Sequence, residues 1–407
     1  MTQPLPYHEL ARLMTRTYHG EDLTELGQAL IQQSTRSGSE GAAEALLDLA
    51  ILLHLKGFHE MARDIQMQGL RQRQSYVIPA NGAPTAMRLL MLMVPGELNA
   101  NTPVEFLVQD SDVELQQLYI GRELPFPDEI PEHDVAMVAV GESEDSLALL
   151  AALGKALVHW PRPVINHPER IAALARDSLV GLLQGVEGLA LPPTFRINRA
   201  TIETWAGLAK KEHGLVAEPD YPVIVRPVDS HAGRGLVKVE TAGAWKGYLA
   251  AQPEDVFFVS PFVDYRSADG LFRKYRVALV DGVPFAGHMA ISAHWMVHYL
   301  NGGMTESEEK RIEEARFMEH FDREFGKRHL RTLQQIHQRL GLDYVVLDCA
   351  ETPDGHFLLF EADSSAVVHA MDPVTLFPYK HPAMAKVFAA FRALLDRARA
   401  RPSGLVG

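Results

Sequence analysis

The strongest constraint on the fold is a pair of apolar segments that carry three acidic residues. Asp348 follows the apolar residues 345–347, and Glu361 and Asp363 end the second segment. The Asp354-Gly355 dipeptide between the segments is typical of a tight β-hairpin turn. In such a hairpin Asp348 lies beside Glu361, and Glu361 and Asp363 point to one face because side chains alternate along a strand.

Three carboxylates on one face of apolar strands repel one another unless a cation neutralises them. Hard oxygen ligands of this kind suit Mg²⁺ or Mn²⁺ shared with a nucleotide phosphate. We therefore predict Asp348, Glu361 and Asp363 as metal ligands. The plainer interpretation is a solvated strand edge.

The segment 221–236 has the composition of an anion-binding strand and loop. An apolar strand ends at Arg226, so a guanidinium and backbone N–H groups can converge on a phosphate. The alternative is a hairpin turn that uses glycine for positive φ, and the loop matches neither the Walker pattern nor the dinucleotide fingerprint. The loop residues that we predict to bind a cofactor are Ser230, His231, Gly233 and Gly235.

Charge and cysteine content exclude several classes of protein. The 39 Lys+Arg and 52 Asp+Glu residues give a net charge of -13, so we expect neither nucleic acid nor a membrane as a partner. Cys349 is the only cysteine, which excludes an intrachain disulfide and a thiolate zinc cluster. With no signal-like N-terminus and no apolar stretch of membrane-spanning length, we expect a cytoplasmic protein.

The first part of the chain predicts an all-α leader, residues 1–78. Apolar residues recur at helical spacing from Tyr7 to Gln74, with no proline between Pro6 and Pro79. Residues 45–79 resemble one tetratricopeptide unit. The other interpretation is a helical hairpin packed on the next domain.

Beyond a turn-rich linker at residues 76–85, strands alternate with helices. The apolar runs 87–94, 104–108 and 135–140 are each short enough for a buried strand, and 146–157 has helical spacing. This alternation predicts a mainly parallel α/β sheet domain. After Pro192, strand-like segments joined by turns such as Asp281-Gly282 instead predict antiparallel sheets, and residues 305–340 predict helices.

Taken in their order along the chain, the segments from residue 87 to the C-terminus resemble the ATP-grasp superfamily of carboxylate-amine ligases. The matching motifs are Val225-Arg226-Pro227 with its Gly-rich loop, the segment 257–263, and Asp348 followed by Glu361-Ala362-Asp363. Residues 165–171 and 191–194 are similar to the entry into that fold in glutathione synthetases and ribosomal-protein glutamate ligases.

The resemblance implies an α/β and α+β fold that clamps ATP and Mg²⁺ (or Mn²⁺). It divides the chain into a preATP-grasp parallel-sheet domain (86–190), a small lobe with the Gly-rich loop (191–262) and a C-terminal lobe with the metal site (263–400). The implied reaction converts a carboxylate into an acyl phosphate and joins it to an amine, with release of ADP and phosphate. The further cofactor-binding residues that it implies are Ser260, Phe262, Val263 and Lys274.

Arg276 shares a strand face with Lys274, and in the family a basic residue in this position contacts the phosphate. The sequence departs from the family at Arg226, where lysine is usual, at Ser178, where another nucleotide-binding lysine is frequent, and at Asp363, where asparagine is usual. Arginine keeps the charge and adds a planar fork suited to phosphate oxygens.

The segment 292–304 contains Gly302-Gly303 near its end, and the equivalent acceptor-binding segment of the related glutamate ligases ends in Gly-Gly. It carries His294, Trp295 and His298 in place of basic residues. We predict that His294 and His298, with Arg276, are catalytic and that the acceptor is less acidic and larger. The alternative is that both are core or interface histidines.

The predicted partners are a small-molecule or peptide carboxylate and an amine. The helical leader offers an apolar surface for a homodimer or a protein partner. The rival hypothesis is a degenerate ATP-grasp scaffold that acts through this leader.

Overall fold

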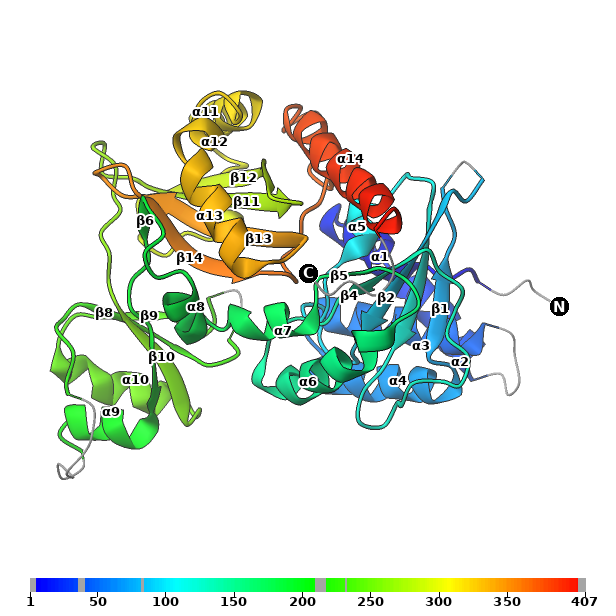
Figure 1. The fold of residues 1–407 in the computed structure, drawn as a ribbon. Helices are drawn as coiled ribbons and strands as arrows, with labels where there is room; N and C mark the ends of the chain where they lie inside the picture. The colour runs from blue at the N-terminus through cyan, green and yellow to red at the C-terminus, as the bar shows by residue number, and fades with distance from the viewer. Residues whose placement is uncertain (1–4, 36–40, 82–83, 209–216, 231–232, 402–407) are drawn as a thin grey trace.

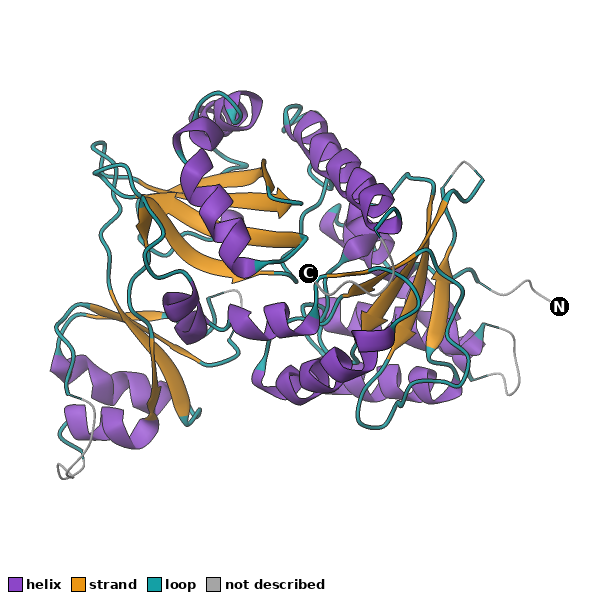
Figure 2. Cartoon of the chain, in the orientation of Figure 1, coloured by secondary structure: helices purple, strands orange, loops and turns teal. Residues whose placement is uncertain are grey.

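Three β-sheets and their helices make up the structure (Figures 1 and 2). It is a computed structural model, and it describes residues 5–35, 41–81, 84–208, 217–230 and 233–401. The predicted fold class, mixed α/β and α+β behind an all-α N-terminal region, is confirmed.

The leader is helical and lies around the first sheet, in blue in Figure 1. Its α3–α4 hairpin turns at Gly57, whose positive φ of 83° suits glycine. Ala43, Leu47 and Leu70 belong to the same buried cluster as the sheet, so the hairpin packs on the next domain, as the plainer interpretation held. The leader helices are α1 (Glu9–Tyr18), α2 (Thr24–Ser34), α3 (Ala42–Leu55) and α4 (His59–Gln72).

The first sheet has the strand order β1-β3-β2-β4-β5, and all its pairs are parallel except β1 with β3. The predicted parallel α/β domain is therefore confirmed. The strands are β1 (Ser75–Ile78), β2 (Met87–Met93), β3 (Val113–Tyr119), β4 (Val135–Val138) and β5 (Val164–Ile165). The helices that follow them are α5 (Val104–Leu107), α6 (Leu147–Ala156), α7 (Pro168–Ile171) and α8 (Arg176–Leu182).

Two predictions for this region were wrong. Residues 104–108 were expected as a strand, but Val104–Leu107 forms α5, because a short apolar run has the same appearance in a buried helical turn as in a strand. The linker expected at residues 76–85 begins with part of β1, which pairs with β3 and buries Tyr76. The leader thus ends inside the first sheet.

The second sheet is antiparallel, with the order β7-β10-β8-β9. Its strands are β7 (Phe195–Asn198), β8 (Val223–Pro227), β9 (Val237–Val239) and β10 (Val256–Pro261), and its helices are α9 (Arg199–Trp205) and α10 (Trp245–Ala251). This lobe has a separate hydrophobic core, with Trp245 and Phe257 fully buried in it.

The third sheet has the order β12-β11-β13-β14-β6, antiparallel except for β14 with β6. The Asp281-Gly282 turn joins β11 to β12 with positive φ at both residues, as a type I′ hairpin requires. The strands are β6 (Leu189–Ala190), β11 (Phe272–Val280), β12 (Val283–Ser292), β13 (Tyr344–Glu351) and β14 (Phe357–Asp363). The helices are α11 (Glu308–His320), α12 (Phe325–Arg328), α13 (Leu330–Leu340) and α14 (Lys380–Arg399).

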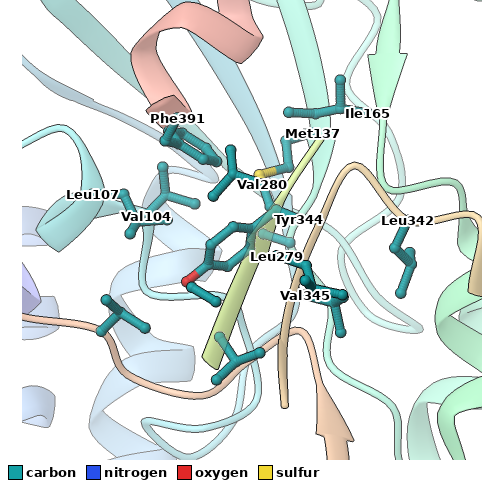
Figure 3. Packing of buried hydrophobic residues seen from close by; sticks show 14 of the residues in the cluster. Val104, Leu107, Met137, Ile165, Leu279, Val280, Leu342, Tyr344, Val345 and Phe391 are labelled. Atoms are coloured by element: carbon teal, nitrogen blue, oxygen red, sulfur yellow. The ribbon is translucent and has the colours of Figure 1, made fainter. Parts of the chain in front are cut away.

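The first and third sheets share one continuous core. Figure 3 shows Met137 of β4 near Tyr344 of β13 and Phe391 of α14, and all three belong to one buried cluster. These two sheets therefore form one packed unit, and the second sheet forms another. The short 3₁₀ turns are η1 (Glu144–Ser146), η2 (Leu157–His159), η3 (Ala172–Leu174), η4 (Ala242–Ala244) and η5 (Tyr299–Asn301).

No helix in the described part of the chain has both the length and the apolar composition needed to cross a bilayer.

Buried carboxyl groups lie where the leader meets the first sheet. Glu9 is 4% exposed and Glu105 5%. Gln117 donates a hydrogen bond from Nε2 to Glu105 Oε1 (2.6 Å) and accepts one from the Tyr7 hydroxyl (3.0 Å). Burial, and then the charge of Glu105, raises the pKa of Glu9 to about 8, while burial raises the pKa of Glu105 to about 7.

Both carboxyl groups hold protons more tightly in the folded chain, so their ionisation opposes folding. The free energy of unfolding should therefore fall as pH rises from the ordinary glutamate pKa, by up to roughly 1.4 kcal/mol per pH unit for each group. The contribution of Glu105 ends at about pH 7 and that of Glu9 at about pH 8. Urea unfolding at pH 5, 6.5 and 8 measures this slope. The double substitution Glu9→Gln, Glu105→Gln should make this slope shallower, because the other carboxyl groups with raised pKa values, such as Asp363, remain. Glu25→Gln, at an exposed position, should leave the slope unchanged; an unchanged slope in the double variant would contradict the assignment.

Candidate functional site

A cavity of about 740 Å³ brings most of the predicted site residues together. Its walls come from the second and third sheets, with side chains from α1, α8 and α14. The predicted residues that line it are Arg226, Gly233, Ser260, Phe262, Val263, Lys274, Arg276, His298, Asp348, Glu361 and Asp363.

Three predicted residues do not line the cavity. Ser230 instead accepts a hydrogen bond from Arg226 Nε (3.0 Å) and donates one to the Pro227 carbonyl (2.7 Å), so it holds the arginine in place. Gly235 lies in a turn, where its positive φ of 64° and the close Pro227 ring require glycine. A Cβ at this position would lie 2.6 Å from the ring. His294 is exposed.

His231, also predicted to bind a cofactor, lies outside the described residues.

The predicted hairpin register is confirmed at the centre of the cavity. Asp348 on β13 pairs with Glu361 on β14, and on its other side with Arg276 on β11. A cation and two carboxylates therefore stand in one row across three adjacent strands.

A β-bulge interrupts the sheet on each side of this row. On β12 the register shifts so that Gly287 is the extra residue opposite Arg276, and on β14 the extra residue is Phe360, next to Glu361. The Phe360 carbonyl, released from regular pairing, accepts a hydrogen bond from Arg176 (3.0 Å). Bulges turn side chains at functional sites out of the regular pleat, and these two fix how Arg276 and Glu361 are directed.

Asp348 is neutralised by two basic side chains of the adjacent strand. Lys274 Nζ lies 2.7 Å from Asp348 Oδ2, and Arg276 Nε donates to Oδ1 at 2.8 Å. Burial favours the protonated acid, but the charges of Arg276 and Lys274 hold the pKa of Asp348 well below its usual value. The expected repulsion among three bare carboxylates is therefore partly relieved without a metal.

Glu361 and Asp363 form a second, less balanced acidic pair. Arg176 lies 2.5 Å from Glu361 Oε1, and against the opposing effect of burial the charges of Arg176 and Arg226 lower the pKa of Glu361 to about 2. Burial and the charge of Glu361 raise the pKa of Asp363 to about 7. Negative charge at Asp363 is thus incompletely offset.

The residues fit a divalent cation in part. Among the described residues no three Asp, Glu, His or Cys side chains stand close enough to hold a metal ion, so the three-acid site stays a prediction. Glu361 and Asp363 do supply hard oxygen atoms on one face of β14, and the Ser365 hydroxyl beside them is buried with no hydrogen-bond partner among the described residues. Asp348 is already engaged by Lys274 and Arg276.

Among the described cations that line the cavity, Arg226 has the least compensation for its charge. It makes no ion pair with a carboxylate in the described part of the chain, and its guanidinium donates only to Ser230. Burial, and then the charge of Arg176, lowers the pKa of Arg226 to about 10. Two arginines from two lobes therefore face one cavity, which suits an anion with several oxygen atoms.

Two histidines lie near the row of charges. His298 lines the cavity, and its partial burial and the charges of Lys274 and Arg276 lower its pKa. His288, which pairs with Arg276 across β11 and β12, also lines the cavity and has its pKa lowered by burial. Both imidazoles are therefore neutral near pH 7.

Sequence reasoning missed Arg176. The lysine expected near Ser178 is absent, but Arg176 lies two residues earlier at the start of α8 and supplies the cation. A basic residue close to the expected position was the available signal.

It also missed a polar cluster at another part of the cavity wall. There Lys380 Nζ lies 3.0 Å from Asp372 Oδ2, and the Tyr18 hydroxyl donates to Asp372 Oδ1 at 2.9 Å. Glu314, fully buried, accepts from the Tyr299 hydroxyl at 3.0 Å. Residue separations as large as 354 gave no local pattern that could reveal the cluster.

No family model and no curated protein matches the sequence. Among solved structures, the D-alanine–D-alanine ligase from Bacillus anthracis complexed with ATP aligns with 77% of this chain and 98% of its own, at 13% identity and a TM-score of 0.45. The VanG D-Ala:D-Ser ligase from Enterococcus faecalis aligns with 76% and 99%, at 12% identity and a TM-score of 0.45. A RimK domain ATP-grasp protein from Sphaerobacter thermophilus aligns with 76% and 99%, at 15% identity and a TM-score of 0.41. At such identities and TM-scores we infer function from the side chains of the cavity.

The bulge residue Gly287 offers a test of the charge row. A Cβ at this position would lie 2.9 Å from Arg276 Cγ and 3.0 Å from the Arg276 carbonyl oxygen. Gly287→Ala should therefore displace Arg276 from Asp348 and lower the free energy of unfolding by about 1–3 kcal/mol in urea titrations. Gly247→Ala, in α10 with no atom within 4 Å of its Cβ, should be neutral or stabilising; equal effects of the two substitutions would contradict the assignment.

Proposed function

We propose that this protein is an ATP-dependent ligase of the ATP-grasp superfamily, which activates a substrate carboxylate as an acyl phosphate and joins it to an amine. The observation that carries the proposal is Arg226, a partly buried cation that lines the cavity together with Arg176 and has no carboxylate ion pair among the described residues. A triphosphate would remove the mutual repulsion of these arginines. Its charge-assisted hydrogen bonds to them would also be strong, because the site is partly shielded from water.

The end of β10 and the residues that follow it offer a site for the base of the nucleotide. Ser260 lies at the end of β10, and Phe262 and Val263 follow it along the cavity wall. The aromatic ring of Phe262 contacts Trp295 edge-on, with 5.9 Å between centroids. Aromatic and apolar side chains beside the Ser260 hydroxyl suit a purine, which needs both stacking and hydrogen bonds.

Glu361 and Asp363 would hold the Mg²⁺ that accompanies the nucleotide. The ion would supply charge neutralisation for the transferred phosphoryl group. Asp348, paired with Lys274 and Arg276, would mainly orient these two cations.

The reaction takes two steps. First, a carboxylate oxygen of the substrate attacks the γ-phosphorus and the bond to the ADP oxygen breaks, while Lys274 and Arg276 offset the negative charge of the transferred group. Second, the amine attacks the acyl carbon and phosphate leaves with the bonding electrons. The surplus proton of the amine passes to His298, whose lowered pKa keeps it neutral and able to accept.

The scaffold hypothesis is less consistent with the charges. Burying several ionised groups together is costly unless binding or chemistry uses them, and apolar residues would serve a scaffold better. Release of ADP when candidate carboxylic acids and amines are supplied with Mg²⁺ and ATP separates the two hypotheses.

Arg226→Ala tests the phosphate site. The loss of a charge-assisted contact should weaken Mg·ATP binding by roughly 10- to 150-fold in calorimetry. The nucleotide-free melting temperature should stay unchanged or rise, because an uncompensated cation is removed from a partly buried position. Arg266→Ala, which removes an arginine paired with Asp264 on the surface, is the control and should leave the affinity intact; parental affinity in Arg226→Ala would place the phosphates elsewhere.

Glu361→Gln with Asp363→Asn tests the metal assignment. The double variant should lose the additional thermal stabilisation that Mg²⁺ gives to the ATP complex, because two hard anionic ligands are gone. ATP without metal should bind it at least as tightly as the parent, since two negative charges near the triphosphate are removed. Retention of the full Mg²⁺-dependent shift would show that the metal binds at other residues.

A further inference from the structure

We propose that the leader helix α1 forms one wall of the acceptor subsite, and that this subsite takes an amine that carries a bulky apolar group and no acidic group. The inference rests on the proposed ligase function and adds the class of the second substrate. It also gives the leader a role inside the catalytic cavity.

Two side chains of α1 line the cavity. Met14 and Tyr18 stand four residues apart, so they share one face of the helix. The Tyr18 hydroxyl donates to Asp372 Oδ1 at 2.9 Å, and a ring nitrogen of His19 lies 2.8 Å from the Met371 carbonyl oxygen. These contacts hold α1 against the segment that precedes α14, and the wall is preformed.

The surface beside α1 is apolar and adaptable. Met14 packs on a buried cluster that contains Phe106 and Met371, and Met384 of α14 also lines the cavity. Methionine side chains are flexible and polarizable, so they accommodate apolar groups of different shapes. This part of the cavity therefore suits an aliphatic or aromatic substituent.

The charges of this wall disfavour an acidic substrate. Lys380 is the cation there, and its charge is offset by Asp372 at 3.0 Å and Glu314 at 3.7 Å. A carboxylate on the acceptor would meet Asp372 and find no unpaired cation among the described residues of this wall. The free-energy cost of removing the acceptor carboxylate from water would then not be offset by a favourable contact.

The subsite adjoins the reacting centre. Arg276, which pairs with Asp348, also donates from Nη1 to the Val367 carbonyl at 3.0 Å. Val367 packs on the same apolar cluster as Met14. An amine seated against α1 would thus lie next to the cation that faces the acyl phosphate, which is the position required for attack on the acyl carbon.

The test measures binding to the full chain by calorimetry, with and without Mg²⁺ and a non-hydrolysable ATP analogue. The probes are L-leucinamide, L-phenylalaninamide and the α-amide of L-glutamic acid, which present the same amine beside apolar or acidic groups. The two apolar amides should bind at least about tenfold more tightly than the acidic one.

Variants of α1 connect this preference to the proposed wall. Met14→Ala and Tyr18→Ala should each weaken binding of L-leucinamide by roughly five- to tenfold and leave affinity for the ATP analogue unchanged, which also verifies that they fold. Met61→Ala, on the exposed face of α4 in the same leader, is the matched control and should change neither affinity.

The outcomes separate this inference from the proposed function. Failure of the parent chain to bind the ATP analogue would overturn the ligase proposal. The inference about α1 is overturned if no amide binds, if the acidic amide binds best, or if the substitutions at Met14 and Tyr18 leave amide affinity at the parental value. Selective weakening in these variants supports it, whether or not the nucleotide is present.

Discussion

The ion pairs of Asp348 organise the rest of the cavity. This carboxylate is buried in the third sheet and would be costly there alone, but Lys274 and Arg276 on the adjacent strand compensate it. Because Arg276 is fixed by both Asp348 and the Val367 carbonyl, it connects the acidic strands to the segment that leads into α14. The regions of the cavity that we propose for phosphate and acceptor are therefore both connected to this one buried charge.

The proposed anion site lies between two separately packed cores. The first and third sheets share one core, which carries Asp348 and Glu361 on its strands, whereas Arg226 stands on the second sheet with a core of its own. A bound triphosphate would bridge two separately packed units. Its charge would offset repulsion between Arg226 and Arg176, so the interaction between the lobes would strengthen as the ligand binds.

Local sequence patterns were sufficient to predict much of the fold and part of the candidate site. Strand alternation and one turn dipeptide predicted that Asp348 pairs with Glu361, because register in a hairpin follows from the turn. The same reasoning failed for residues 104–108, where a short apolar run has no period to distinguish helix from strand. Arg176 and Tyr18 were missed since their roles depend on contacts with residues far away in the sequence.

The balance of charge in the cavity bears on the form in which the proposed nucleotide would bind. Among the described residues, five cationic side chains and four carboxylates line it, and burial with the charge of Glu361 raises the pKa of Asp363. A free triphosphate would approach Arg226 and Arg176 favourably but would meet Glu361 and Asp363 with its own negative charge. A triphosphate that arrives with its divalent cation satisfies both sets of groups, since the cation offsets the acids while the phosphate oxygens contact the arginines.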